Sequence, residues 1–362
     1  MRSVSAQDAR TGIPRGSAGL NPVGIKTFSI IVPVYNGAEV IADCLNSILR
    51  SRVDVPYEVI VVDDGSTDAT KEVVGRFPVR YFRIEKSGVA KARNTGIKAA
   101  TGDALLFFDA DVILHEDTLS RFLFHFNDDH DAYIVQGRWD KNQPSPSFGT
   151  EFLLLRFTYN LETLFNGQRR LRVAELMSGC CGIRKEVFES FEGFNESYKF
   201  AGGEEFEFGL RVISKYQIYY YPDVVVYHRF GTLFETARKV FFRTTNYSML
   251  VFSSQYKRMF LRLTANSVPD RDKKSMIILS LIFLSLIASF FAANWAMILL
   301  PLLIAGYVLN IRDFIRYLYN EKGLLFTIKG ALSDIFMTAP RIFGLMRAGF
   351  VFYVLRIEDY KI

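Results

Sequence analysis

The sequence predicts an α/β domain with a mostly parallel sheet, followed by a helical region that associates with a membrane. Three observations lead to this prediction. Short β-rich runs alternate with segments of helical periodicity from residue 27 to about residue 230. Basic residues are then mixed with aromatic and aliphatic ones over 231–274. Finally, no charged side chain occurs between Ser275 and Ile311. With 362 residues, 49% of them hydrophobic, the chain can form a globular domain and a further part.

The composition also limits the partners and the compartment. The net charge of +6 is modest, and acids and bases alternate over most of the chain, which does not favour a nucleic acid as partner. The three cysteines cannot all pair with one another and form no C-x-x-C pattern, so we expect a reducing compartment. Residues 1–25 contain Ser, Gly, Pro and Arg but no apolar run, which predicts a disordered tail without a secretory signal.

The first half of the α/β domain consists of strands that are each followed by a helical segment. The strand candidates are FSIIVPVY (28–35), YEVIVVDD (57–64), VRYFRI (79–84) and ALLFFDAD (104–111). Helices are predicted over 38–49, where apolar residues form one stripe, after GSTDAT (65–70), and from about 87 to 100. Crossover helices between strands predict βαβ units and a parallel sheet. The region up to about residue 230 is expected to complete the same domain, giving boundaries of 26–230.

Polar side chains follow the apolar part of several of these strands. They are Tyr35, Asn36, Asp63, Asp64, Asp109 and Asp111. Ligands bind beyond the carboxyl ends of the strands in parallel sheets, so this edge is the predicted binding site. Asp109 and Asp111 are one residue apart, project the same way in an extended segment, and repel each other. Mg²⁺ or Mn²⁺ with a diphosphate would relieve that repulsion. Alternatively, the two acids close a strand and cap a helix.

Four motifs, taken together, carry a resemblance to a known family. SIIVPVYNGAEVIADCLNSIL, EVIVVDDGSTDAT, GVAKARNTGIKAATGDALLFFDAD and GGEEFEF resemble the family 2 glycosyltransferases of the GT-A fold, in order and at similar spacing, over residues 27–230. The resemblance implies that a sugar is transferred from a nucleoside diphosphate to an acceptor hydroxyl or phosphate. It also implies inversion at the anomeric carbon.

The resemblance further assigns roles to individual residues. Nucleotide-binding positions fall on Pro33, Tyr35, Asn36, Asp64, Arg93 and Asp109. Among them, Pro33, Tyr35 and Asn36 would form the nucleoside-binding loop, and Asp64 would contact the base. Asp64 could instead serve an Asp-Gly turn. Asp111 would hold the metal ion together with Asp109, and His228 would be a third ligand or a phosphate donor.

The acid pair Glu204 and Glu205 aligns with the Glu-Asp pair of the family, whose second member is the base. The resemblance thus implies that Glu205 is the base, although a glutamate stands where the family has an aspartate. The additional methylene moves the carboxylate by about one bond length, and near-attack geometry is sensitive to shifts of roughly 1 Å, so Glu204 remains the alternative. Both acids could also simply favour the start of a helix.

The C-terminal part is predicted to anchor the protein. In 231–274, basic side chains on an amphipathic stretch suit an anionic membrane surface; they include Arg238, Lys239, Arg243, Lys257, Arg258 and Arg262. The uncharged run 275–311 is too long for one span of roughly 20 residues and somewhat short for two, which predicts a helical hairpin that spans the membrane or is re-entrant. Its ends carry positive charges, namely Arg271, Lys273, Lys274, Arg312 and Arg316.

By the positive-inside rule, these flanking charges place the catalytic domain on the cytoplasmic face. The last segment, 312–362, is apolar but interrupted by Lys329, Asp334, Arg341 and Arg347. Charges are costly near the centre of a bilayer, so we expect amphipathic interfacial helices there.

The predicted function is a membrane-associated, metal-dependent inverting hexosyltransferase for cell-surface glycan or glycolipid assembly. Its donor would be a nucleoside-diphosphate sugar and its acceptor a lipid or a lipid-linked saccharide. A polyprenyl-phosphate sugar synthase is the alternative enzyme. A processive polysaccharide synthase is disfavoured because the Q-x-x-R-W motif is missing. From a different class, a catalytically silent, membrane-anchored module that binds nucleotide sugars would retain only the nucleotide pocket.

Overall fold

The computed structural model describes residues 24–144, 146–198, 202–252, 269–290 and 294–356. The predicted tail 1–25 therefore lies outside the described residues, except for its last two positions. Ile25 is buried, and its backbone N–H donates to Asn127 Oδ1 at 2.8 Å. The packed domain thus includes Ile25, which the prediction had assigned to the tail.

The first half of the domain forms the predicted parallel sheet. Its strands are β1 (Phe28–Val34), β2 (Tyr57–Asp63), β3 (Arg80–Arg83) and β4 (Ala104–Phe108), and its helices are α1 (Ile41–Arg50), α2 (Thr70–Val74) and α3 (Val89–Ala99). The strand order is β3-β2-β1-β4 with every neighbouring pair parallel. All carboxyl ends of these strands therefore meet at one edge, which is the predicted site.

The second half extends the same sheet with strands of both directions. It contains β5 (Val112–Leu114), α4 (Thr118–Asp128), β6 (Ile134–Trp139), α5 (Phe148–Phe165), β7 (Leu171–Val173), β8 (Cys180–Arg184), α6 (Lys185–Ser190), α7 (Glu204–Val212) and β9 (Ile218–His228). Within the described residues the sheet has nine strands in the order β3-β2-β1-β4-β8-β6-β9-β5, with β7 beside β9. β8 runs antiparallel to β4 and to β6, whereas β6 and β9 are parallel. The prediction of an α/β fold with a mostly parallel sheet is confirmed.

Two hydrophobic cores cover the two faces of the sheet, because successive side chains of a strand point to opposite faces. Along β1, Ile30 and Val32 belong to the core that contains α1 and α4, whereas Ile31 belongs to the core that contains α3 and α7. These side chains are fully buried. Full burial of each contributes about 1.5–3 kcal/mol, so the β1 alternation fixes the register of the sheet.

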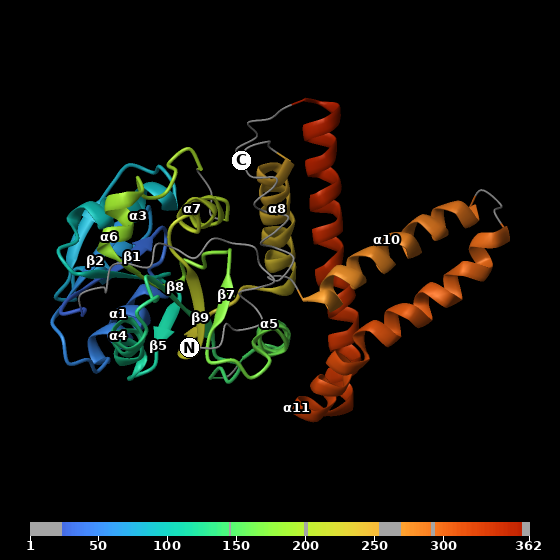
Figure 1. The fold of residues 1–362 in the computed structure, drawn as a ribbon, viewed down its shortest axis with the longest axis horizontal. Coiled ribbons are helices and arrows are strands. Elements are labelled where there is room, and N and C mark those ends of the chain that lie inside the picture. Colours follow the sequence, from blue (N-terminus) through green and yellow to red (C-terminus); the bar gives the residue numbers. More distant parts are fainter. Residues whose placement is uncertain (1–23, 145, 199–201, 253–268, 291–293, 357–362) are drawn as a thin grey trace, which may run out of the picture.

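The C-terminal region forms helices that project from the domain (Figure 1). They are α8 (Leu233–Phe252), α10 (Asp270–Phe290), α11 (Asn294–Gly349) and a short π-helix, Phe350–Val354. Gly323 has a left-handed φ of 77°, which breaks α11 into two parts. α10 and the first part of α11 form a hairpin, and the second part of α11 runs back beside α8.

This hairpin corresponds to the predicted one over 275–311, but its arms are longer, because α10 begins at Asp270 and the second arm continues to the break at Gly323. Its turn, 291–293, lies outside the described residues. Large apolar side chains point outward from both arms; they include Ile277, Leu284, Leu302 and Leu309. The helical stretch Leu299–Val354 is, among the described residues, long and apolar enough to cross a membrane.

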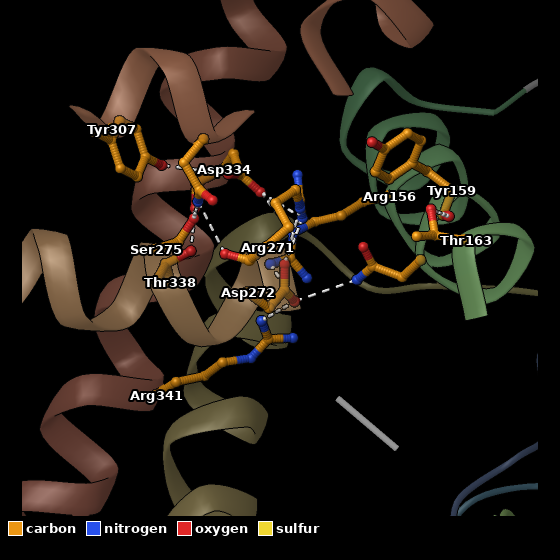
Figure 2. Close-up of polar contacts among 12 residues, drawn as sticks. Arg156, Tyr159, Thr163, Arg271, Asp272, Ser275, Tyr307, Asp334, Thr338 and Arg341 are labelled. Atoms are coloured by element: carbon orange, nitrogen blue, oxygen red, sulfur yellow. Dashed lines mark hydrogen bonds and ion pairs between the residues drawn. The ribbon is translucent and has the colours of Figure 1, made fainter. Parts of the chain in front are cut away.

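A buried ionic cluster joins the hairpin to the α/β domain (Figure 2). We call it the ionic junction, and it consists of Arg156, Arg271, Asp272, Asp334 and Arg341. Arg156 of α5 donates to Asp334 Oδ1 at 2.7 Å and to Asp272 Oδ2 at 2.9 Å. Arg271 and Arg341 both contact Asp272 as well. The sequence suggested that Arg271 is a flanking surface charge and that Asp334 and Arg341 lie at an interface; all three instead pair inside the protein.

Candidate active site

The acid pair stands where β4 ends and the chain turns into β5. The backbone N–H of Asp109 donates to the carbonyl of Gly179 at 3.3 Å, which links this turn to the segment before β8. A Cβ at Gly179 would lie 2.7 Å from Asp109 Oδ2, so only glycine leaves room for the carboxylate in this position. Gly179, in the run MSGCCG (177–182), therefore sets the space that is available to the Asp109 carboxylate.

Arg93 of α3 connects the two groups of acids. Its guanidinium donates from Nη1 to Glu204 Oε1 at 2.7 Å and from Nη2 to Asp109 Oδ1 at 3.2 Å. The side chain is buried, and its Nε makes no hydrogen bond. Burial lowers the pKa of Arg93, but Glu204 and Asp109 outweigh this effect and raise the pKa. Arg93 is thus a fixed positive charge between the acid pair and α7.

Glu204 and Glu205 begin helix α7 but have different partners. Glu204 is 1% exposed; its Oε1 accepts from Arg93, and its Oε2 accepts from the backbone N–H groups of Gly202 and Gly203. Glu205 is 8% exposed, and its Oε2 accepts from Ser178 Oγ at 2.5 Å. Both oxygens of Glu204 are therefore occupied, whereas Oε1 of Glu205 accepts no hydrogen bond from the residues that the structure describes. Burial, followed by repulsion from Glu204, raises the pKa of Glu205.

Asp111 and His228 face each other beyond the acid pair. Asp111 Oδ1 is buried without a hydrogen-bond partner and lies 3.6 Å from His228 Nε2. β5 and β9 bring these residues together, since Val112 pairs with His228 in the register of the sheet. Burial lowers the pKa of His228, so its ring is neutral near pH 7 and can be a ligand. Burial also raises the pKa of Asp111. A cation would reverse this effect.

These donors fit a hard divalent cation. A carboxylate oxygen without a partner beside a neutral imidazole is a suitable pair of ligands. Among the described residues, no group of three or more His, Cys, Asp and Glu side chains gathers to hold an ion. Mg²⁺ characteristically takes few protein ligands and completes its shell with substrate phosphates and water, so the incomplete set fits an ion that arrives with a diphosphate.

The predicted nucleoside loop lies at the same edge of the sheet. Tyr35 is exposed, and Lys86 Nζ lies 2.9 Å from the centre of its ring. Asn36 has a left-handed φ of 48°, and its Oδ1 accepts from the backbone N–H of Thr67 at 2.8 Å. Pro33, in contrast, is buried inside β1 and not in the loop itself, and its contact with a nucleotide stays a prediction. Because the apolar run of β1 continues directly into Tyr35 and Asn36, the sequence did not show that the strand ends at Val34.

Asp64 has a clear structural role. Its carboxylate accepts from the backbone N–H of Ser87 at 2.7 Å and from that of Gly88 at 2.9 Å, directly before α3. The side chain thus holds the start of the helix that carries Arg93. Contact with a nucleotide base stays a prediction for Asp64.

The structure adds three residues that the sequence did not assign to the site. Ser178 binds Glu205, Gly179 leaves room for Asp109, and Arg243 of α8 lies against Gly202. Arg243 was expected to face an anionic membrane surface with the other basic residues of its segment. In the sequence, the serine and glycines of MSGCCG (177–182) were the feature that could have indicated Ser178 and Gly179.

Comparisons with known proteins agree with this arrangement. Residues 29–191 match the family model described as Glycosyl transferase family 2. The fold resembles that of the mannosyltransferase PcManGT from Pyrobaculum calidifontis, solved in complex with GDP-Man and Mn²⁺, with a TM-score of 0.56 and 20% identity over 94% of this chain and 92% of that one. This chain therefore carries a family 2 glycosyltransferase domain with the GT-A fold.

Curated relatives match parts of the chain. Glycosyltransferase AglE of Haloferax volcanii is 42% identical over 100 residues, which are 26% of this chain and 33% of that protein. The PGL/p-HBAD biosynthesis glycosyltransferase of Mycobacterium bovis is 29% identical over 219 residues, covering 58% of this chain and 79% of that protein. The chain thus spans only about a third of the length of the first of these relatives.

Proposed function

We propose that this protein is a membrane-associated inverting glycosyltransferase that moves a sugar from a nucleoside-diphosphate sugar to a lipid or lipid-linked saccharide. The observation that carries the proposal is the position of Glu205, whose carboxyl group has a raised pKa. It lies near the acid pair Asp109 and Asp111, which Arg93 contacts through Asp109 at the edge where the parallel strands end. The groups proposed to bind a diphosphate and the proposed base are thus linked through Arg93 and Glu204 at this edge of the sheet. GDP-Man and Mn²⁺, the ligands of PcManGT, support this donor class and a divalent ion for a chain of the same fold.

On the donor side, Asp111 and His228, with Asp109 nearby, would hold Mg²⁺ or Mn²⁺. Such an ion stabilises negative charge on the departing diphosphate. Arg93 holds Asp109 in place through its 3.2 Å contact. Tyr35 and Asn36 present an exposed ring and an ordered turn at the same edge, where the nucleoside would lie.

On the acceptor side, Glu205 is the base. Its Oε1 would take the proton from the acceptor hydroxyl while the hydroxyl oxygen attacks the anomeric carbon from the face opposite the diphosphate. Ser178 holds the other oxygen at 2.5 Å and so orients the carboxylate. Glu204 is not the base in this proposal, because Arg93 and two backbone N–H groups occupy it.

The helical hairpin would place this site at a membrane surface. Both arms expose large apolar side chains that water solvates poorly, and the ionic junction fixes the base of the hairpin on the α/β domain. Arg312 and Arg316 are exposed and follow directly after the predicted apolar run. By the positive-inside rule, these positive charges would lie in the cytoplasm, together with the catalytic domain.

The test starts from donor binding. The full-length protein in detergent is screened against nucleotide sugars with Mn²⁺ for a rise in melting temperature, which reports affinity. Turnover is then measured with the stabilising donor and prenyl-linked acceptors. We expect Glu205→Gln to retain donor stabilisation and to lose turnover. A wild-type protein stabilised by no nucleotide sugar, or full turnover in Glu205→Gln, would contradict the proposal.

A further inference from the structure

Gln136 is a polar side chain that is completely buried in the middle of the sheet. It lies on β6, where the preceding residues Ile134 and Val135 belong to the cores on opposite faces. Because the side chains of a strand alternate between the two faces, Gln136 points to the face of Ile134, which α7 covers. A buried amide without hydrogen bonds is costly. The partners of Gln136 therefore show what this side chain holds.

These partners are backbone groups of the segment that precedes β8. Nε2 of Gln136 donates to the carbonyl of Glu175 at 3.0 Å, and Oε1 accepts from the backbone N–H of Met177. Residues 175–177 belong to no helix or strand, so regular secondary structure does not supply partners for their backbone groups. The amide of Gln136 bonds the backbone on both sides of Leu176, as a neighbouring strand would.

The backbone that carries Gln136 is itself closely packed. A Cβ at Gly137, the next residue of β6, would lie 2.6 Å from Cys180 Sγ and 2.7 Å from the carbonyl oxygen of Val224. Only glycine therefore lets β6 approach both β8 and β9 this closely. Gln136 pairs with Cys181 in the antiparallel register of β6 and β8. Its side chain thus starts from a strand that is fixed by its neighbours.

The segment that Gln136 holds continues directly into the contact with Glu205. Ser178 follows Met177, and its backbone N–H and its Oγ both donate to Glu205 Oε2, at 3.2 and 2.5 Å. The backbone N–H of Cys180 then donates to the carbonyl of Met177 at 3.4 Å and closes a turn around Ser178. Gln136 is thus connected to Glu205 through the backbone of Met177 and Ser178.

We propose that Gln136 is a positioning residue, which fixes Ser178 and, through Ser178, the carboxylate of Glu205. This inference rests on the proposed function, in which Glu205 is the base. Ser178 donates two hydrogen bonds to one carboxylate oxygen, so a shift of its backbone moves that oxygen as well. Near-attack geometry is sensitive to such shifts, since a displacement of about 1 Å can cost roughly 100-fold in rate.

The kinetic test compares Gln136→Met, which removes the amide at similar side-chain size, with Ser178→Ala and with the double variant. The full-length protein in detergent is assayed for release of nucleoside diphosphate from GDP-Man and from UDP-glucose. Each single variant should lower kcat roughly 10- to 100-fold and change the donor KM less than about twofold. Both changes act through one contact, so the double variant should be no slower than the slower single variant. Losses that multiply, or wild-type kcat in Gln136→Met, would overturn the proposal.

Hydrogen exchange followed by mass spectrometry tests the same role without a donor. In Gln136→Met, the amides of Met177 and Ser178 should exchange about tenfold faster or more, with exchange in β1 unchanged. The matched control is Gln143→Met, because Gln143 also donates to a backbone carbonyl, that of Asp140 at 2.9 Å, in the loop after the same strand. This control should change neither kcat nor exchange at 177–178. Wild-type exchange at 177–178 in Gln136→Met would refute the role of Gln136.

Failure of this inference can be told from failure of the proposed function. Full turnover in Glu205→Gln would refute the base, whatever the result for Gln136→Met. Loss of turnover in Glu205→Gln together with wild-type kcat in Gln136→Met would leave the base in place and refute only the positioning role. In a protein that already carries Glu205→Gln, Gln136→Met should cause no further loss of kcat.

Discussion

Replacing Asp334 by asparagine should destabilise the protein strongly although the residue lies far from the candidate active site in sequence. Asp334 is fully buried. Its carboxylate accepts from Arg156 Nε at 2.7 Å, from Arg271 Nη2 at 3.4 Å and from Tyr307 OH at 3.3 Å. The three arginines and two aspartates of the ionic junction carry a net charge of +1, and the variant raises this to +2 without changing the shape of the side chain.

The expected cost follows from the burial of the cluster. Removing one partner of a buried ion pair costs about 3–5 kcal/mol, because the other charge stays behind without compensation. For domains of 150–250 residues each kcal/mol lowers the melting temperature by about 2–4 °C, so we expect a fall of roughly 6–20 °C.

The assay is thermal unfolding in detergent, followed by circular dichroism. The control is Asp313→Asn on the same helix, whose side chain is 62% exposed and pairs with Arg312 and Arg316 only at 3.6 and 4.0 Å. Exposed pairs contribute about 0–1 kcal/mol, so its melting temperature should change by no more than a few degrees. Equal shifts in the two variants would refute the idea that the ionic junction holds the hairpin on the α/β domain.

Three further outcomes are expected at the site. In steady-state kinetics, Glu205→Gln should lower kcat by about 10²–10⁴-fold and retain donor affinity. Glu204→Gln should chiefly lower the free energy of unfolding. The reverse pattern would show that Glu204 is the base. Gly179→Ala should reduce kcat/KM by roughly 10- to 100-fold, because its methyl group displaces Asp109, whereas Gly306→Ala, with nothing within 4 Å, should not. On acidification, activity should begin to fall at a pH above the usual pKa range of glutamate. The base must be ionised to act, and the raised pKa of Glu205 moves the acidic side of the pH–rate profile to higher pH. A pH–rate profile with its acid limb at or below pH 4 would contradict this assignment.

The parts of the molecule that were predicted from sequence depend on local patterns. The apolar run that ends in Asp109 and Asp111 showed both the strand and the acid pair, because strand alternation and carboxylate placement act over a few residues. A helix start at Glu204 and Glu205 was the alternative interpretation of these two acids, and α7 does begin there. The reversal of β8 was not predicted, since a short apolar strand does not encode its direction.

The remaining features depend on contacts between distant segments. Arg156 and Asp334 are 178 positions apart, so the charges of the ionic junction resembled surface charges in the sequence. Arg243 likewise belonged to a basic amphipathic stretch, and only the packing of Tyr247 on Phe206 shows which face it lies on. The break at Gly323 could be suspected from a glycine but not located, because helices tolerate isolated glycines.

The most direct measurement is Mn²⁺ binding to the full-length protein, followed by electron paramagnetic resonance in the presence and absence of a nucleoside diphosphate. The site geometry predicts weak binding of the ion alone, since Asp111 and His228 are an incomplete ligand set, and much tighter binding once the diphosphate is added. Asp111→Asn should abolish this gain. Ion binding that is independent of the diphosphate, or unchanged in Asp111→Asn, would contradict the placement of a cation-bound diphosphate at this edge of the sheet.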